Sequence, residues 1–176
     1  GGGSWATAIM KMLTEDNGRE PAGRQVGWWV RSQDTVDHIK VHHHNPRYIS
    51  SVKFDPERIS ITTDMKRIVK NSDTMILAVP SAFLKSALEQ IDKSSFEDRM
   101  IFSAVKGIVP ETLQIVGDFI GEHYNTPKAH FGVICGPCHA EEVAMEKLSY
   151  LTIACQDTAK AETMAERLRT SYIRAT

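Results

Sequence analysis

Glycines at the start of this chain have the spacing of a phosphate-binding turn. In GGGSWATAIMKML, Gly1, Gly3 and Ala6 fill the pattern G-x-G-x-x-G/A, and the apolar residues that follow have helical spacing. Small residues here allow a tight turn, a close approach of the backbone to an anion, and close packing of the helix whose first N–H groups face that anion. A GGGS linker ahead of a helix would give the same pattern, so the motif alone leaves both interpretations open.

A lysine follows what the sequence predicts to be a buried strand. Lys106 comes directly after IFSAV and before Gly107, so we expect it at the carboxyl end of a strand, where open α/β sheets bind their ligands. A lysine there can neutralise a phosphate or polarise a carbonyl group. The alternative is a solvated loop lysine, which is less expected between a buried strand and a glycine.

The tetrapeptide CGPC at residues 135–138 is also the active-site motif of thioredoxins. In that class a helix N-terminus lowers the pKa of the first thiol, and the two thiols cycle between dithiol and disulfide. A thiol-disulfide oxidoreductase using Cys135 and Cys138 is therefore an alternative function. Against it, no proline follows Pro137 to supply the cis-proline loop of thioredoxins, and Ile134 stands where they carry a tryptophan.

Three adjacent histidines, His42, His43 and His44, raise the question of a metal site. Adjacent side chains in a loop diverge, and no acidic or cysteine cluster completes a coordination shell at suitable spacing. We therefore expect no metal.

Short apolar runs alternate with amphipathic stretches, which predicts an α/β fold with a doubly wound, mostly parallel sheet covered on both faces. The expected strands are residues 26–30, 59–62, 74–79, 100–104, 131–134 and 150–154. One expected helix follows Gly3, and a second begins at Ser81 as its cap. A third carries Pro110 in its first turn, and a fourth runs from Asp157 to Leu168. Residues 15–25 and 44–58 are expected to be loops.

Composition limits the classes of partner. The 176 residues include 21 Lys and Arg against 22 Asp and Glu, and 41% are hydrophobic, as in an ordinary soluble domain with one core. No basic run is long enough to follow a nucleic-acid backbone, and no apolar run approaches the ~20 residues of a membrane helix. We expect neither nucleic acid nor a membrane as partner. Three cysteines leave one over from any disulfide framework, which favours a reducing, cytoplasmic location.

Six stretches in sequence order resemble the NAD(P)-dependent glycerol-3-phosphate dehydrogenases of bacterial type. They are GGGSWATAIMKML at residue 1, WWVR at 28, HNPRYIS at 44, ILAVPSAFL at 76, SAVKGIVPET at 103 and CGPCHAEEVAMEKLSYLT at 135. The resemblance covers nearly the whole chain and implies that residues 1–176 are an N-terminal, Rossmann-like dinucleotide-binding domain. It also implies that the first strand, before Gly1, is missing from the sequence. The helical substrate domain and its proton-accepting lysine would lie beyond Thr176, so no catalytic residue is expected within this chain.

The resemblance assigns binding roles to individual residues. Those expected to bind the cofactor, NADP or NAD, are Gly1, Gly3, Ser4, Trp5, Arg31, Tyr48, Phe83, Lys106 and Ala140. Those expected to bind the substrate are Lys106, Gly136 and Cys138. Many relatives carry a serine or threonine where Cys138 offers a weaker thiol donor.

Some of these residues have a plainer interpretation. Arg31 ends a predicted strand, where it can pair with a 2′-phosphate and so favour NADPH, but a surface arginine close to Asp34 and Asp37 is the alternative. Trp5 and Phe83 could equally be core residues.

The activity that the resemblance implies is hydride transfer between NAD(P)H and the dihydroxyacetone phosphate and sn-glycerol 3-phosphate pair. It would act on a small-molecule phosphate, supply phospholipid synthesis, and form a homodimer at full length. A dehydrogenase of another hydroxy acid is a neighbouring alternative, and a domain that only binds nucleotide, or does not fold alone, is another.

Overall fold

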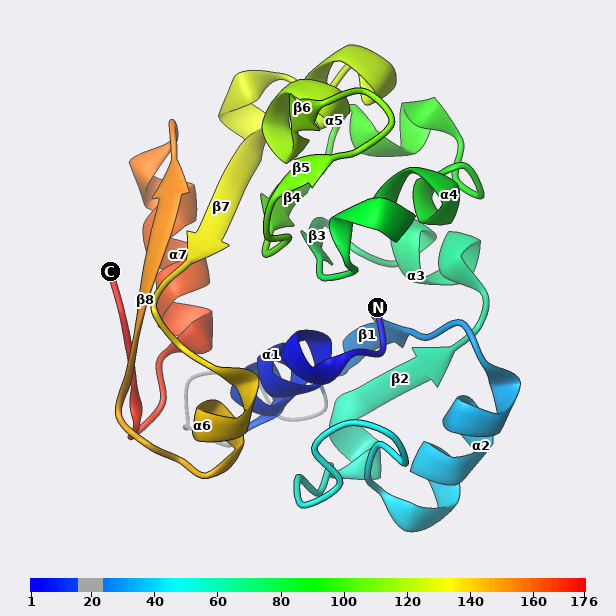
Figure 1. Ribbon diagram of the computed structural model, residues 1–176, viewed down its shortest axis with the longest axis vertical. Helices are drawn as coiled ribbons and strands as arrows, with labels where there is room; N and C mark the ends of the chain where they lie inside the picture. The colour runs from blue at the N-terminus through cyan, green and yellow to red at the C-terminus, as the bar shows by residue number, and fades with distance from the viewer. Residues whose placement is uncertain (16–23) are drawn as a thin grey trace.

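The strands form two separate sheets with one small hairpin. The computed structural model describes residues 1–15 and 24–176. Within them, β1 (Val26–Trp29) and β2 (Ile59–Thr62) form a parallel pair in the lower part of Figure 1. A five-stranded sheet follows the order β3 (Thr74–Leu77), β4 (Met100–Ser103), β7 (Phe131–Cys135), β8 (Ser149–Cys155) and β9 (Ile173–Ala175). The hairpin pairs β5 (Ile108–Val109) with β6 (Gln114–Ile115).

Helices pack on both faces of this arrangement. They are α1 (Ser4–Thr14), α2 (Gln33–His42), α3 (Met65–Lys70), α4 (Leu84–Leu88), α5 (Val116–Tyr124), α6 (Ala140–Ala144) and α7 (Thr158–Leu168). Short 3-10 turns cover Pro56–Arg58, Ser81–Phe83, Lys93–Phe96 and Lys128–His130. One core joins α1, α6 and α7 to the five-stranded sheet, a second joins α3, α4 and α5 to its other face, and a third joins α2 to β1 and β2.

β4 shows how the sequence sets this layering. Its four residues are all buried. Met100 and Phe102 belong to the core with α1 and α7, whereas Ile101 belongs to the core with α4 and α5. Successive side chains of a strand point to opposite faces, so a continuous apolar run is what a strand covered on both faces requires.

A cavity separates β1 from β3. In the described chain, β1 pairs with β2 alone and β3 pairs with β4 alone. Between them lies a cavity of about 880 Å³, lined by α1, β1, α3, β3 and α4 and including the side chains of Trp28, Met75 and Leu77. The sheet is open at the position where the resemblance places a further strand.

Most of the expected elements are confirmed. All six expected strands are present, with ends that differ by at most two residues. α1 has the expected apolar face, and Asp157 caps α7 by accepting hydrogen bonds from the N–H groups of Ala159 and Lys160. Residues 44–58 form the expected loop apart from one 3-10 turn. The loop expected at residues 15–25 lies mostly outside the described residues.

The expectation of a sheet covered on both faces is wrong at one edge. β7 and β8 pair antiparallel, and one face of this pair is open, with Val133 37% and Tyr150 58% exposed. The alternation of buried and exposed residues along both strands is that of a half-covered antiparallel pair. β9, which continues the sheet beyond β8, was not among the expected strands.

The expected starts of two helices are also wrong. Pro110 lies in the turn of the β5–β6 hairpin, and α5 begins at Val116. Ser81 begins a 3-10 turn with no side-chain cap, ahead of α4. Phe83 is 57% exposed, so it lies off the apolar face that Leu84 and Leu88 bury.

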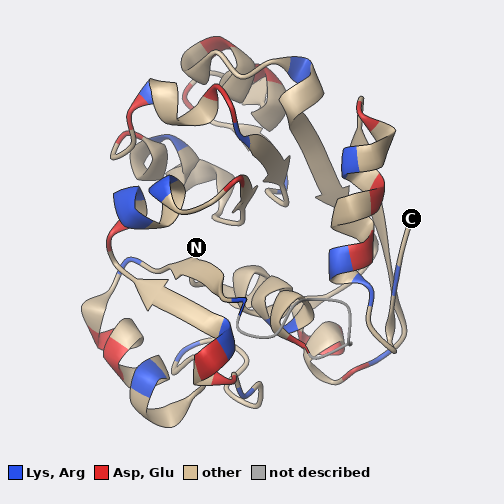
Figure 2. Ribbon diagram, turned by 180° about the vertical axis from the view of Figure 1, so that it is seen from behind, with Lys and Arg blue, Asp and Glu red and all other residues tan. Residues whose placement is uncertain are grey.

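Charge is spread over the whole surface. Figure 2 shows Lys and Arg interspersed with Asp and Glu on helices of both parts of the molecule. None of the described helices is long and apolar enough to cross a membrane.

Candidate cofactor and substrate site

The glycine turn lies at the carboxyl ends of β1 and β3. A Cβ on Gly1 would stand 2.3 Å from the carbonyl oxygen of Ala78, and a Cβ on Gly2 would stand 3.2 Å from Cγ1 of Val30. A backbone oxygen cannot move aside as a flexible side chain can, so Gly1 allows a close approach that no other residue would. A Cβ on Gly3, by contrast, would meet nothing within 4 Å. The turn is packed on one side and open on the other.

α1 presents an uncapped N-terminus at this turn. Gly3 is its N-cap residue, and no side chain caps the helix. The first N–H groups of an α-helix have no partner within the helix, and the macrodipole favours negative charge there. The residues present therefore fit the pyrophosphate of a dinucleotide, which binds at such a helix start.

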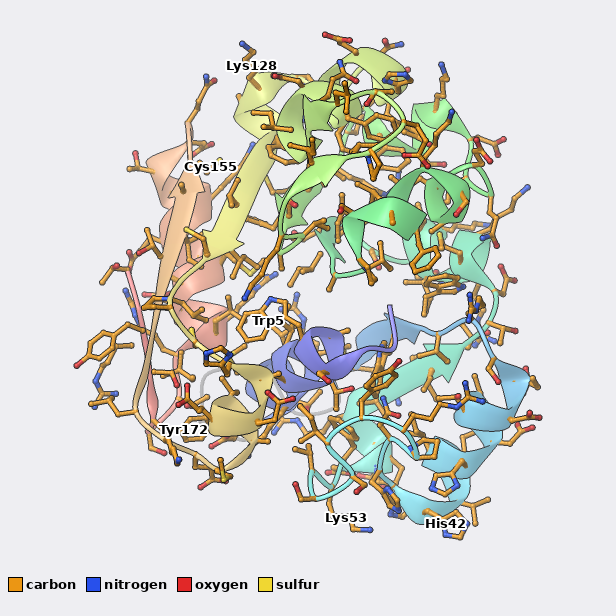
Figure 3. The ribbon with its side chains drawn as sticks, viewed as in Figure 1. Trp5, His42, Lys53, Lys128, Cys155 and Tyr172 are labelled. Carbon is orange, nitrogen blue, oxygen red and sulfur yellow. The ribbon has the colours of Figure 1, made fainter. Side chains whose placement is uncertain are left out.

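The two residues after the turn lie in the first turn of α1. Ser4 and Trp5 begin α1, and both are partly buried. Trp5 packs against the core shared by α1, α6 and α7, and Figure 3 shows its side chain at the start of α1. Trp5 thus contributes to the core, as its plainer interpretation held, while it lies beside the turn.

Three further predicted cofactor residues are exposed, in the segments that follow β1, α2 and β3. Arg31 follows β1 directly before α2. Tyr48, 44% exposed, lies in a loop that Asn45 joins to Gly2 by a hydrogen bond. Phe83 follows β3, and its exposure overturns the core interpretation. Exposed aromatic rings beside an anion site give flat apolar surfaces against which a ligand ring can pack.

Lys106 is exposed at the carboxyl end of β4. The N–H of Ala104 donates to the carbonyl of Leu77 at 2.9 Å, which places the ends of β3 and β4 side by side. Gly107 then turns the chain at φ +88, with its Cβ position 3.7 Å from Oγ of Ser81. Lys106 therefore lies at the same sheet edge as the glycine turn, as predicted.

Residues 135–138 pack against β8. A Cβ on Gly136 would stand 2.3 Å from the carbonyl oxygen of Tyr150, and the thiol of Cys138 donates to that oxygen at 3.1 Å. Burial raises the pKa of the Cys138 thiol, while the positive charge of Lys106 acts in the opposite direction. Lys106 and Cys138 are thus close enough to interact, and buried Ala140 begins α6 just beyond them.

These thiols do not have the features of a redox pair. In a CGPC redox pair the first cysteine is the reactive thiol and lies at the start of a helix. α6 begins at Ala140, after both cysteines. Cys135 donates weakly to the carbonyl of Thr152, and Cys135, Cys138 and Cys155 are all free. The thiol-disulfide alternative finds no support in this geometry.

The three adjacent histidines, His42, His43 and His44, lie at the end of α2 and directly after it. The ring centroids of His38 and His42 are 4.4 Å apart, and those of His38 and His44 are 4.8 Å apart. Among the described residues, no group of three or more histidine, cysteine or acidic side chains is arranged to hold a metal ion.

Two residues behind the turn were missed as candidates. Asn45 and Trp28 both donate to carbonyls of the glycine turn. Each lies within a motif already quoted, HNPRYIS and WWVR. The sequence did contain a signal for Asn45. It is an amide residue directly before a proline, in the same loop as Tyr48, which was predicted to contact the cofactor.

Comparisons with known proteins show which family this chain belongs to. The family described as NAD-dependent glycerol-3-phosphate dehydrogenase N-terminus matches residues 1–161. A glycerol-3-phosphate dehydrogenase [NAD(P)+] of Exiguobacterium is 35% identical over 175 residues, covering 99% of this chain and 49% of the relative. A relative of the same name from Limosilactobacillus reuteri is 29% identical over 178 residues, covering 99% of this chain and 51% of the relative. The chain thus spans about half the length of these curated relatives.

Solved structures show the same relationship. A Plasmodium falciparum glycerol-3-phosphate dehydrogenase superposes with a TM-score of 0.83 at 26% identity, covering 99% of this chain and 49% of that one. The Coxiella burnetii enzyme superposes with a TM-score of 0.81 at 22% identity, covering 99% and 51%, and supports the Rossmann-like fold.

Proposed function

Because the chain belongs to the NAD-dependent glycerol-3-phosphate dehydrogenase family, as its N-terminal domain, we propose that the full-length protein interconverts dihydroxyacetone phosphate and sn-glycerol 3-phosphate. Hydride passes between the substrate's carbon 2 and a nicotinamide cofactor, NAD or NADP. The observation that carries the proposal is the shared sheet edge, where the packed glycine turn, the uncapped start of α1 and Lys106 lie at the ends of adjacent elements.

The residues of this edge have complementary tasks. Gly1 and Gly3 let the backbone approach a pyrophosphate, and the N–H groups at Ser4 and Trp5 stabilise its charge. When bound, the cofactor supplies or accepts the hydride. Tyr48, Phe83 and Ala140 form its surroundings on this proposal.

Lys106 orients and polarises the substrate. Lys106 is exposed at this sheet edge, and its positive charge acts on the Cys138 thiol. Such a charge stabilises a phosphate or a carbonyl oxygen. Gly136 and Cys138 line the rest of the pocket. The Cys138 thiol already donates to Tyr150, so it is a weak partner for a substrate hydroxyl. The proton acceptor would be a lysine of the second domain, beyond Thr176.

Arg31 supports a preference for NADPH. It is exposed directly after β1, where an acidic residue would bind the ribose hydroxyls of NAD. A guanidinium group there pairs with a 2′-phosphate.

The proposal extends to the whole molecule. One more strand fills the cavity between β1 and β3 and joins the two sheets, so that residues 1–176 form most of a cofactor domain. A helical substrate domain completes the pocket, and the full-length chain forms a homodimer. The free thiols support a reducing cytoplasm, where the product would enter phospholipid synthesis.

Steady-state turnover of the full-length protein tests the function. We expect oxidation of NADPH with dihydroxyacetone phosphate, and little or none with unphosphorylated dihydroxyacetone, because Lys106 and the neighbouring backbone bind the phosphate end. Equal turnover of the two ketones, or turnover of another hydroxy acid without a phosphate, would replace this substrate assignment. Absence of turnover with either cofactor would refute the dehydrogenase assignment.

A further inference from the structure

Each of the three carbonyl groups of the glycine turn accepts a hydrogen bond from another residue of the protein. The indole N–H of Trp28 donates to the carbonyl of Gly1 at 2.8 Å, and the side-chain amide of Asn45 donates to that of Gly2 at 3.0 Å. The carbonyl of Gly3 accepts from the N–H and the hydroxyl of Thr7, both at 2.9 Å. Three consecutive acceptors are therefore paired on the protein side of the turn.

This pairing fixes the direction of the N–H groups. A trans peptide unit is planar, and its C=O and N–H point in opposite directions. A donor that holds the carbonyl of Gly1 inward therefore turns the N–H of Gly2 outward, and a donor on Gly2 does the same for the N–H of Gly3. We propose that Trp28 and Asn45 are positioning residues that set the anion-binding N–H groups of the glycine turn. The inference rests on the proposed function, in which this turn binds the cofactor pyrophosphate.

Both the NH₂ group and the oxygen of the Asn45 side chain take part in this arrangement. Its side chain is 0% exposed. Its NH₂ group donates to Gly2 and to the hydroxyl of Thr7, at 3.0 and 2.9 Å, and its oxygen accepts from the N–H groups of Arg47 and Tyr48. One buried amide thus joins the glycine turn to the loop that carries Tyr48. An aspartate has the same shape, but it cannot donate two hydrogen bonds.

Trp28 offers a test with a close internal control. Its ring is 3% exposed and packs edge-on against Phe54, with centroids 5.2 Å apart. Neighbouring Trp29 also donates its indole N–H to a backbone carbonyl, that of Thr63 at 3.0 Å, which is not part of the glycine turn. Trp28→Phe and Trp29→Phe therefore each remove one comparable hydrogen bond and keep an aromatic ring.

In the full-length protein, we expect Trp28→Phe to raise the KM for NADPH by about two- to tenfold, the usual effect of one neutral hydrogen bond. The kcat at saturating NADPH and the KM for dihydroxyacetone phosphate should change little. Trp29→Phe should leave all three constants near those of the wild type. Equal KM changes in both variants, or no change in Trp28→Phe, would overturn the role of Trp28.

Asn45→Asp adds a pH readout that a merely structural role would not give. Complete burial at this position raises the pKa of an introduced carboxyl group, while the N–H groups of Arg47 and Tyr48 act in the opposite direction. We expect burial to dominate, so that the introduced aspartate gains a proton within the assay range. The protonated form can donate to Gly2 again, whereas the carboxylate repels that carbonyl oxygen. The ratio of the variant's KM for NADPH to that of the wild type should therefore fall as pH is lowered from about 8 to about 6. Asn71→Asp, at an exposed amide after α3, should show no such trend.

Asn45→Ala completes the series. It should raise the KM for NADPH by about ten- to a hundredfold at every pH, because the Gly2 carbonyl is left unpaired and no new group titrates. If Asn45→Asp and Asn45→Ala lower the thermal midpoint yet keep the wild-type KM for NADPH, Asn45 serves stability alone and the proposal is wrong. A wild type that binds no nicotinamide cofactor would instead refute the proposed function.

Discussion

Arg31 is the residue that should decide between the two cofactors. Replacing its guanidinium by a carboxylate removes the partner of a 2′-phosphate and supplies one for ribose hydroxyls. We expect Arg31→Asp to shift the ratio of kcat/KM for NADPH and NADH toward NADH by roughly tenfold or more, as loss of a charge-assisted pair implies. Lys40→Asp, an equal change of charge at an exposed site near the end of α2, should leave the ratio close to its original value.

The buried thiol of Cys138 gives a test of the alternative function. Burial raises the pKa of this thiol, and the thiolate is the form that reacts with alkylating reagents. Iodoacetamide should therefore modify exposed Cys135 well before Cys138 at neutral pH, and modification of Cys138 should accelerate only as the pH rises. Peptide mass spectrometry over time measures both rates. Rapid modification of Cys135 at a pH well below the normal range for a thiol, as a reactive first cysteine of CGPC requires, would reopen the redox interpretation.

At the scale of single elements, α7 depends on its cap. The Asp157 carboxylate accepts from two N–H groups of the first turn, and these bonds, with the nearby Lys160 charge, lower its pKa in the folded protein. A folded-state pKa below the unfolded value stabilises the fold above the unfolded value, and this contribution is lost as pH falls through the folded value.

We therefore expect Asp157→Ala to lower the thermal midpoint at neutral pH. The difference from the wild type should narrow as the pH drops below the normal range for an aspartate. Asp118→Ala, at an exposed aspartate in the first turn of α5 that makes no cap, should have a smaller effect. If the difference in thermal midpoint between Asp157→Ala and the wild type does not change with pH, the carboxylate charge is not the source of the stabilisation.

Helices and strands were predictable where a local sequence signal agreed with the burial of the same residues in the structure. The strand at β4 and the cap of α7 follow from a continuous apolar run and from an aspartate before a helical pattern. The hairpin around Pro110 was not predictable in this way. Its strands have two residues each, and Leu113, at φ +56, is exposed although its spacing matches the apolar face of α5.

The site was predictable for a different reason. The positions of the glycine turn, Lys106 and residues 135–138 follow from motifs placed at the ends of strands. The hydrogen bonds of Asn45 and Trp28 to the turn join segments distant in sequence, so they become visible only when β1 and the following loop are brought against α1.

For the whole molecule, the gap between β1 and β3 is the main structural expectation. An apolar extended segment of about five or six residues placed ahead of Gly1 should enter the cavity and pair with both strands. Backbone amides of β1 and β3 should then exchange hydrogen more slowly, and the free energy of unfolding should rise. A matched segment with alternate residues replaced by proline cannot donate to the ladders and should give no protection. Unchanged exchange in β1 and β3 with the apolar segment would contradict a strand at this position.

The measurement that tests the account most directly is turnover of the full-length protein with Lys106→Met. The account predicts that NADPH oxidation by dihydroxyacetone phosphate collapses by about a hundredfold or more, as loss of a charge that stabilises the transition state implies. The matched Lys128→Met, at an exposed site away from the glycine turn in Figure 3, should stay near the wild-type rate. Wild-type turnover in Lys106→Met would contradict the claim that cofactor and substrate meet at this edge of the sheet.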